Sequence, residues 1–392
     1  MSIVLLVRYA EIHLKGLNRP YFERMLVDRI KDSLAISDVK IVREQGRVFI
    51  YDIPQDKIEI AIDKTCKVFG VHSVSPAYCV EKDWTAIKNK AVELMNEYAS
   101  KEVTFKCFAK RSDKRFPMTS EQICRELGHE LLEAYSTLSV DVHHPEVKLT
   151  IEVRQEKTFI YTKEYKAVGG MPVGTNGKAM LLISGGIDSP VAGYMIAKRG
   201  VALSAVHFYS YPYTSERARD KVVELTRLVS DYAGEIDLYL VPFTEIQLTI
   251  YEKCPSSETT VLMRRLMMKI AEIIANKCGA QALITGESIG QVASQTMDSL
   301  ACTDDAVSLP VFRPLIGFDK EEIVERAQQI GTFETSILPY EDCCTVFVPV
   351  HPVTRPKVEQ LRKSESLVDF APMIDKAIQS TEVVKISHIV KD

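Results

Sequence analysis

Residues 184–189, which read SGGIDS, are the segment of this sequence whose residue types and spacing are best suited to chemistry. They follow the apolar run 179–183 and precede a helical pattern that we expect to begin at Ser189, with Pro190 at the first helical position. Adjacent glycines let backbone N–H groups approach an anion closely, and a helix N-terminus adds positive potential. The segment therefore predicts a phosphate-binding loop. It is neither a lysine-bearing P-loop nor a GxGxxG dinucleotide fingerprint.

Asp188 makes this loop more specific than a glycine turn in front of a helix, which is the simplest alternative interpretation. Its carboxylate would lie beside bound phosphates, and Mg2+ between the two groups would remove their repulsion. The SGGxDS signature resembles that of the PP-loop ATP pyrophosphatases, which cleave ATP between the α and β phosphates and adenylate a substrate. We therefore expect ATP and Mg2+ as cofactors.

Cys343 and Cys344 are a second candidate for chemistry, among nine cysteines in the chain. An odd number spread over a long chain argues against a disulfide scaffold and for reduced thiols in a cytosol. Seven of the nine are expected to pack as small apolar side chains. Glu341 and Asp342 would raise the pKa of a neighbouring thiol, so its activation must come from elsewhere. The cysteine spacing predicts no zinc or iron–sulfur site.

A basic segment, residues 105–116, offers a third kind of site. Its cations are Lys106, Lys110, Arg111, Lys114 and Arg115, against the single acid Asp113, with Phe105, Phe108 and Phe116 between them. Cations bind phosphates, and aromatic faces stack on exposed bases. A solvated surface is the simpler explanation of such a charge run, and RNA binding is the alternative.

Composition limits what these segments can belong to. The chain has 392 residues, 46% of them hydrophobic and 26% charged, as in folded proteins of two or three domains. No apolar run approaches a membrane span, and the start has no leader pattern, so we expect a cytoplasmic protein that contacts no membrane. The net charge is −4, but residues 1–170 hold 27 basic against 25 acidic residues and the remainder 22 against 28. We expect the halves to meet different ligands.

The elements that must position these residues are all of the α/β kind. Residues 1–80 predict the order βαββαβ, a ferredoxin-like unit, and residues 83–165 predict a second small α/β piece. Glycines and a proline interrupt all periodicity at 167–179. Buried strands then alternate with amphipathic helices, which predicts a doubly wound parallel sheet. Ligands bind such sheets at the carboxyl ends of the strands, where residues 184–189 lie.

Several further segments carry a resemblance to one family. They are RYAEIHLKGLNRPYF, SERARDKV, MRRLMMKIAE, TGESIGQVASQT and PYEDCCTVF. Together with the phosphate loop they resemble the tRNA 4-thiouridine synthetases, the ThiI-type sulfurtransferases, over nearly the whole chain. The resemblance implies a ferredoxin-like domain over 1–60 (its last elements reaching about 80), a THUMP RNA-binding domain over 61–165, a linker over 166–178 and a PP-loop domain over 179–392.

The resemblance also implies the reaction, in which ATP adenylates uridine at position eight of tRNA and sulfur replaces its C4 oxygen. It makes Asp188 and Cys344 catalytic and assigns RNA binding to the five cations of residues 105–116. Without that resemblance, His207 would be a core histidine and Arg264 a solvated charge. The residues implied to contact ATP are Leu182, Ile183, Ser184, Gly185, Gly186, Asp188, Ser189, His207, Phe208, Arg264, Gly286 and Gln295.

Partners are implied in the same way. Some family members carry a C-terminal rhodanese domain as sulfur carrier, and this chain ends about forty residues after PYEDCC, so a cysteine desulfurase or another persulfide donor is expected. A homodimer is implied too. Members differ in whether they also supply the thiamine-pathway sulfur carrier protein ThiS. Two other functions are alternatives to tRNA sulfur transfer. One is a PP-loop ligase acting on a small molecule, which leaves the N-terminal 165 residues unexplained, and the other is an RNA-binding adaptor with a degenerate nucleotide site.

Overall fold

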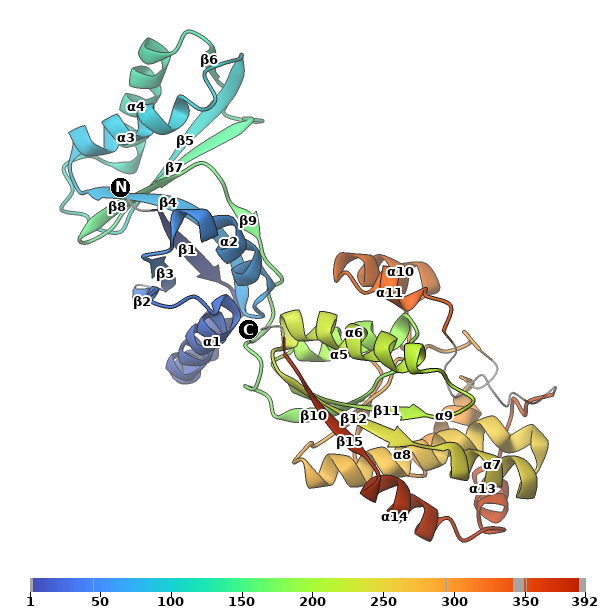
Figure 1. Cartoon of the computed structure of the whole chain (residues 1–392). Coiled ribbons are helices and arrows are strands. Elements are labelled where there is room, and N and C mark those ends of the chain that lie inside the picture. Colours follow the sequence, from blue (N-terminus) through green and yellow to red (C-terminus); the bar gives the residue numbers. More distant parts are fainter. Residues whose placement is uncertain (1–2, 45, 293–294, 341–348, 350, 388–392) are drawn as a thin grey trace. The chain divides into compact units, whose positions relative to one another are not determined.

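The computed structural model describes residues 3–44, 46–292, 295–340, 349 and 351–387, and the chain divides into two compact units, Met1–Gly169 and Gly170–Asp392. Each unit is an α/β structure with its own sheet (Figure 1). Among the described residues, no helix combines the length and apolar character needed to span a bilayer.

Unit 1 is built on one mixed sheet. Its elements are β1 (Ile3–Tyr9), η1 (Glu11–Asn18), α1 (Arg19–Leu34), β2 (Lys40–Glu44), β3 (Arg47–Tyr51), η2 (Gln55–Lys57), α2 (Ile58–Lys67), β4 (Val71–Glu81), α3 (Trp84–Met95), β5 (Val103–Arg111), α4 (Ser120–Ala134), β6 (Leu138–Val140), β7 (Val147–Val153), β8 (Lys157–Tyr161) and β9 (Tyr165–Lys166). The strand order is β2-β3-β1-β4-β8-β7-β5-β6, with β9 paired to β4.

The two small α/β pieces expected from the sequence are thus halves of one continuous sheet. The first half has the βαββαβ order, with β1 between β3 and β4 in antiparallel pairing. Strand β4 carries the sheet onward, because its far end pairs with β8 of the second half. In that half β5 runs parallel to both β6 and β7, and α3 and α4 pack against it and its neighbours. The predicted ferredoxin-like order is confirmed.

A buried polar network joins the two halves. Arg8 on β1 donates to Ser75 at 3.0 Å and lies 3.5 Å from the Glu152 carboxylate on β7. Arg154 and the Tyr161 hydroxyl also donate to Glu152, each at 2.9 Å. Burial alone would raise the pKa of Glu152, but these donors outweigh it and lower that pKa. The Glu152 carboxylate therefore stays ionised in the interior, and it links strands that are far apart in the sequence.

Unit 2 contains the phosphate loop. Its elements are β10 (Lys178–Leu182), α5 (Asp188–Ala197), β11 (Ala202–Tyr209), α6 (Glu216–Ala233), β12 (Ile236–Pro242), α7 (Thr244–Lys253), η3 (Ser256–Glu258), α8 (Thr259–Lys277), β13 (Leu283–Ile284), α9 (Met297–Asp304), β14 (Val311–Phe312), α10 (Lys320–Gln329), α11 (Phe333–Ser336), α13 (Val358–Glu365), α14 (Ala371–Gln379) and β15 (Glu382–Ile386).

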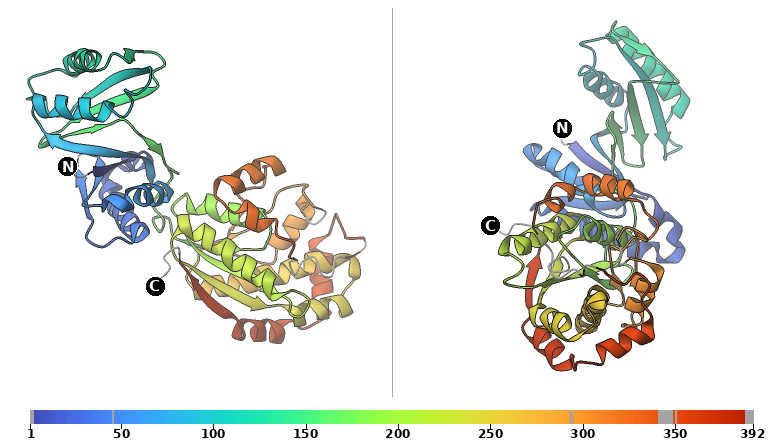
Figure 2. Two further views of the ribbon diagram at one scale, coloured as in Figure 1. Left: turned by 45° about the horizontal axis from the view of Figure 1, so that its top comes forward. Right: turned by 90° about the vertical axis from the view of Figure 1, so that its right-hand side faces the viewer.

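The sheet of unit 2 has the order β14-β13-β10-β11-β12-β15 and helices on both faces. Helices α5 and α6 lie on one face, and α7, α8 and α14 lie on the other (Figures 1 and 2). Five strands run parallel, which confirms the predicted doubly wound class. The exception is β15, which closes the edge antiparallel to β12. The carboxyl ends of β10, β11 and β13 therefore meet at one edge of the sheet.

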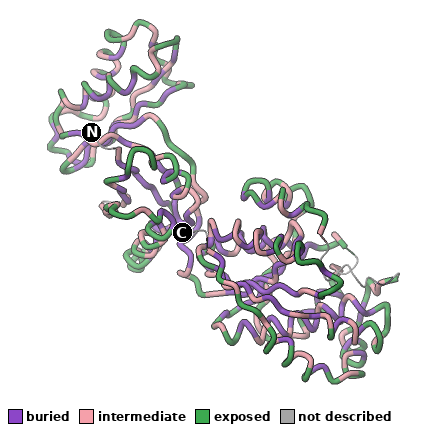
Figure 3. Tube along the Cα trace, viewed as in Figure 1, coloured by how far each residue is buried: buried purple, intermediate pink, exposed green. Residues whose placement is uncertain are grey.

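Burial follows these layers. The strands form the interior of each unit, while the outward faces of the helices are exposed (Figure 3). The larger core of unit 2 lies between the sheet and α8, where Met263, Leu266 and Ile270 pack against Val206 and Val241. This apolar layer gives the loops at the carboxyl edge a rigid support.

Candidate functional site

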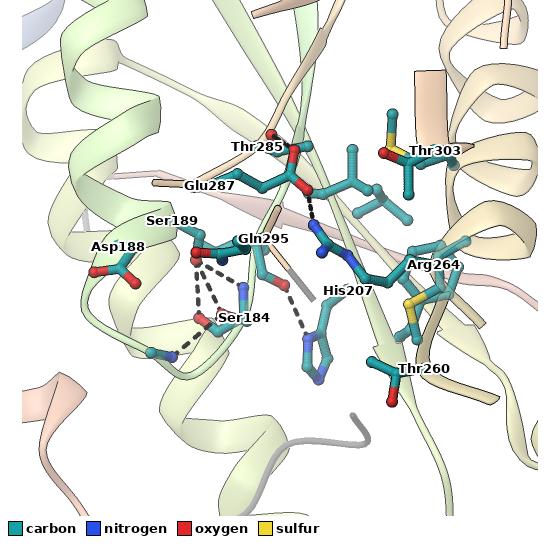
Figure 4. A pocket seen from close by; sticks show the side chains of 18 residues that line it. Ser184, Asp188, Ser189, His207, Thr260, Arg264, Thr285, Glu287, Gln295 and Thr303 are labelled. Atoms are coloured by element: carbon teal, nitrogen blue, oxygen red, sulfur yellow. Dashed lines mark hydrogen bonds and ion pairs between the residues drawn. The ribbon is translucent and has the colours of Figure 1, made fainter. Parts of the chain in front are cut away.

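The phosphate loop is held in shape by its own serines. The Ser184 backbone N–H donates to the Ser189 hydroxyl at 2.9 Å, and that hydroxyl lies 3.3 Å from the Ser184 carbonyl (Figure 4). The Gly186 N–H donates to the Ser184 hydroxyl at 3.3 Å. The expectation that the helix begins at Ser189 is wrong: α5 begins at Asp188, and Ser189 lies within its first turn. Its hydroxyl ties the strand to the helix.

Gly286 brings a second strand end against this loop. A Cβ added at this position would lie 2.7 Å from the Ser189 nitrogen and 2.8 Å from the Asp188 carbonyl carbon. Both are backbone atoms and cannot move without moving the loop. The segment after β13 thus packs directly on the start of α5, and only glycine fits this approach.

A pocket of about 310 Å³ opens beside the loop, at the low end of the range of small-molecule sites. Its lining residues are Leu182, Ile183, Ser184, Gly186, Asp188, Ser189, Val206, His207, Phe208, Thr260, Arg264, Met267, Met268, Thr285, Gly286, Glu287, Gln295 and Thr303. The structure brings together eleven of the twelve residues expected to contact ATP. Gly185 lies in the loop but is not among the lining residues.

One wall of the pocket is apolar and fixed. The His207 ring nitrogen Nδ1 lies 3.1 Å from the Ile183 carbonyl, so the buried imidazole joins β11 to the end of β10. Phe208 packs edge-on against Phe243 with ring centroids 5.4 Å apart. Met267 on α8 supplies flexible apolar surface opposite. A flat, uncharged group such as a purine suits this wall.

The opposite side of the pocket holds a charged cluster that the sequence analysis missed. Arg264, on α8, forms an ion pair with Glu287 (Figure 4), and Arg313 donates to the same carboxylate at 2.6 Å. Glu287 directly follows Gly286 in the TGES segment. Its position in this family motif could have identified it as a site residue. No signal in the sequence pointed to Arg313.

Asp188 faces a second cation that was missed. Its carboxylate accepts from Lys320 at 2.8 Å and from Gln291 at 3.2 Å. Lys320 opens α10, 132 positions along the chain. Gln295, on the same loop as Gln291, accepts from the Ser288 N–H at 3.3 Å through its side-chain oxygen. One lysine and one amide group thus donate to the carboxylate expected to meet the phosphates.

The cysteine prediction falls partly outside the described residues, since Cys343 and Cys344 lie in the segment 341–348. The other seven are free thiols. Cys107 packs beneath α3 and α4 of unit 1, where burial raises its pKa to about 12. Burial likewise raises the pKa of Cys66 to about 11. Neither thiol ionises near neutral pH, which argues against a redox role.

The basic segment divides between two faces of unit 1. Phe105 and Phe116 are buried in the core, so the expected aromatic interleaving is wrong for them. Strand alternation sends odd positions of β5 toward the helices and leaves Lys106, Phe108 and Lys110 on the other face. There Phe108 is 38% exposed and the Lys106 ammonium lies 4.9 Å from its ring centroid.

The remaining cations of that segment differ in their contacts, and not all of them are open to a ligand. Arg111 donates to the Phe116 and Met118 carbonyls, so it holds the turn that follows β5. Arg115 pairs with Asp113, whose pKa is lowered chiefly by hydrogen bonds from Arg115 and Lys82. Lys114 is exposed. Lys148, which was missed, is the exposed β7 neighbour of Lys106 in the parallel ladder.

These observations define a class. Unit 2 is a phosphate-loop α/β domain with a nucleotide-sized pocket at the carboxyl edge of its sheet, and unit 1 is a ferredoxin-like sheet extended by a second α/β half. Family models match three segments of the chain. They are the ThiI ferredoxin-like domain over residues 4–75, the THUMP domain over 81–163 and the thiamine biosynthesis protein ThiI over 174–370.

Individual relatives agree with these matches. The probable tRNA sulfurtransferase of Acetivibrio thermocellus is 56% identical over 392 residues, covering 99% of this chain and 100% of its own length. That of Clostridium kluyveri is 51% identical, covering 98% and 100%. A solved 4-thiouridine synthetase–RNA complex with bound ATP matches with a TM-score of 0.92 at 40% identity, covering 99% of this chain and all of that one. The chain belongs to the ThiI family.

Proposed function

We propose that this protein uses ATP to adenylate uridine at position eight of tRNA and replaces its C4 oxygen with sulfur, which yields 4-thiouridine. The observation that carries the proposal is the pocket of unit 2, where the phosphate loop, the apolar wall and Arg264 line one cavity. The similarity of the whole chain to tRNA sulfurtransferases and to an ATP-bound 4-thiouridine synthetase–RNA complex supports the same reaction.

In the first step the uridine C4 oxygen attacks the α phosphorus of ATP. The bond between that phosphorus and the bridging oxygen breaks, so pyrophosphate leaves and the base carries AMP on its former carbonyl oxygen. Backbone N–H groups of residues 184–189 would hold the phosphates, with the positive end of α5 behind them. His207 and Phe208 would contact the adenine through the apolar wall, and Arg264 and Gln295 would complete the nucleotide contacts.

In the second step sulfur displaces AMP. The outer sulfur of a persulfide attacks C4, and AMP departs with the original C4 oxygen. A thiol then attacks the remaining S–S bond, which leaves sulfur on the base and forms a disulfide. We assign Cys344 either to carry the persulfide or to form that disulfide. Cys343 we assign to packing, because a disulfide between adjacent cysteines is strained.

Magnesium fits this site as an ion held mainly by the substrate. In the described part of the chain no group of three potential ligands converges on one point. Asp188 is the pocket carboxylate beside the phosphate loop, and Mg2+ commonly takes one protein carboxylate plus phosphate oxygens. Bound in this way, the ion would neutralise charge on the leaving pyrophosphate.

The open face of β5 and β7 supports a role in RNA binding. Lys106 lies against the exposed ring of Phe108 on β5, Lys110 follows on the same face, and Lys148 is the β7 neighbour of Lys106. Phosphates bind such cations, and an unpaired base stacks on such a ring. Lys114, Arg115 and Arg111 would extend the contact at the strand end. Binding through phosphates should weaken steeply with salt, and a flat salt response would contradict the assignment.

Other partners follow from the chemistry. The sulfur source is a cysteine desulfurase or another persulfide donor, because the described thiols are buried or partly buried and none lines the pocket. We also propose ThiS as a second sulfur acceptor, which the family's description as a thiamine biosynthesis protein supports. We further propose a cytoplasmic homodimer.

The experiment that tests the function is a reconstitution. The full chain is incubated with ATP, Mg2+, a persulfide source and unmodified tRNA, and both pyrophosphate and 4-thiouridine are measured. The proposal expects both products, each dependent on tRNA. Pyrophosphate released with a small molecule in place of tRNA would favour a PP-loop ligase, and tRNA binding without pyrophosphate would favour an RNA-binding adaptor.

A further inference from the structure

We propose that Glu287 is a positioning residue for the nucleotide step, which fixes the Arg264 guanidinium in the ATP pocket without contacting the nucleotide itself. The inference rests on the proposed function, in which Arg264 contacts ATP. Glu287 is 4% exposed and lies three residues past β13, with its carboxylate directed toward Arg264 (Figure 4).

Both oxygens of the Glu287 carboxylate are engaged. Oε1 forms the ion pair with Arg264, while Oε2 accepts from the Thr285 hydroxyl at 2.8 Å and from Arg313 Nε at 2.6 Å. A carboxylate that is almost fully buried and paired with two guanidinium groups is poorly suited to act as a general base or to enter a metal's ligand shell. Its geometry instead suits holding a cation in one place.

Arg313 is itself anchored from outside the pocket. Its two terminal nitrogens donate to the Asp304 carboxylate at 2.6 and 3.3 Å. Asp304 ends α9, and Arg313 follows β14. The chain Asp304–Arg313–Glu287–Arg264 alternates in sign and joins α9, two strand ends and α8. The carboxylate that holds Arg264 is therefore fixed by groups on separate elements.

This arrangement matters because arginine is long and loses much rotamer freedom when it binds. A guanidinium that a buried carboxylate already holds in place loses less side-chain entropy when it binds the nucleotide. The four charges sum to zero, so the cluster positions donors without adding net positive charge to the pocket. Removing the Glu287 charge should free Arg264 and weaken ATP binding.

The test is a double-mutant cycle on the full chain, with the Kd for ATP and Mg2+ measured by calorimetry. Glu287→Gln keeps the shape and removes the charge, and we expect it to raise the Kd about ten-fold. Arg264→Met should raise it at least as much. If Glu287 acts through Arg264, the double variant binds within about two-fold of Arg264→Met alone. The exposed Glu325→Gln on α10 serves as the matched control, and the Kd for tRNA should be unchanged in all variants.

The outcomes separate this inference from the proposed function. ATP binding by Glu287→Gln at the wild-type level, or additive effects in the double variant, would overturn the positioning role while the function stands. Wild-type binding by Arg264→Met would instead remove Arg264 from the nucleotide contacts, and the positioning role with it. If Glu287→Gln does not fold, Glu287→Asp keeps the charge with a shorter reach. It should also raise the Kd, and wild-type affinity would overturn the inference.

Discussion

At the scale of single residues, we propose that the chemistry of the loop depends most on Asp188. Its carboxylate, at the start of α5, accepts from Lys320 at the start of α10 and from Gln291 in the segment after β13, so two separate segments fix its position. We expect Asp188→Ala to abolish adenylation. Asp188→Asn, which loses the charged hydrogen bond, should slow pyrophosphate release roughly ten- to hundred-fold.

The measurement for Asp188 is tRNA-dependent pyrophosphate release in single-turnover conditions. Asp375→Ala, an exposed carboxylate on α14, is the matched control and should retain wild-type rates. Full pyrophosphate release by Asp188→Ala would show that the carboxylate plays no part in the first step.

Cys344 should separate the two steps of the reaction. Because we assign this thiol to sulfur transfer and not to ATP, Cys344→Ser should still release pyrophosphate and form the adenylated base but yield no 4-thiouridine. Digestion of the tRNA and chromatography of its nucleosides checks this. A Cys344→Ser enzyme that still thiolates tRNA would contradict the assignment, and Cys107→Ser should thiolate normally because its thiol is partly buried and has a raised pKa.

At the scale of elements, the contact between the end of β13 and the start of α5 shapes the phosphate loop. Gly286→Ala would place a methyl group against two backbone atoms of that loop, at 2.7 and 2.8 Å. We expect at least a ten-fold rise in the Kd for ATP, measured by calorimetry, because the loop must shift. Gly317→Ala has open space around it and should bind ATP normally. Normal binding by Gly286→Ala would mean that the loop tolerates displacement.

The elements also explain which parts of the fold the sequence predicted well. Continuous apolar strands such as β10 and β11 carry strong periodic signals, and the phosphate loop follows from the glycines between β10 and α5. Short pieces such as β14 and the antiparallel β15 depend on pairing partners outside their own segments. Their residues show no pattern that distinguishes them from loops.

In the candidate site, too, contacts between distant segments could not be predicted from the sequence. The residues in contiguous motifs were found, whereas Lys320 and Arg313 were not, because each acts through a contact with a distant segment. Phe105 and Phe116 were assigned to the wrong surface for a related reason. Interleaving along the sequence does not reveal which face of a strand packs against helices.

At the scale of the whole molecule, unit 1 depends on an ionised carboxylate inside its sheet. The pKa of Glu152 is lower in the folded state, so its stabilisation is present above the unfolded value of about 4.3 and is lost as pH falls through the folded value. Glu152→Gln should lower the free energy of unfolding of unit 1 by about 3 kcal/mol at neutral pH and flatten its acid dependence.

Trp84 provides the measurement, because it is the one tryptophan of the sequence and lies in α3 of unit 1. Urea unfolding followed by its fluorescence therefore reports on that unit within the full chain. Glu156→Gln, at an exposed position two residues past Arg154, is the matched control. An unchanged acid dependence in Glu152→Gln would mean that other carboxylates control acid unfolding.

The most direct test of the account follows the oxygen that leaves the base. tRNA labelled with 18O at C4 of uridine eight is incubated with the full chain, ATP, Mg2+ and a persulfide source, and the AMP is examined by mass spectrometry. Because the C4 oxygen attacks the α phosphorus and departs with AMP, the account predicts one 18O in each AMP formed with 4-thiouridine. AMP without the label would contradict adenylation of the base.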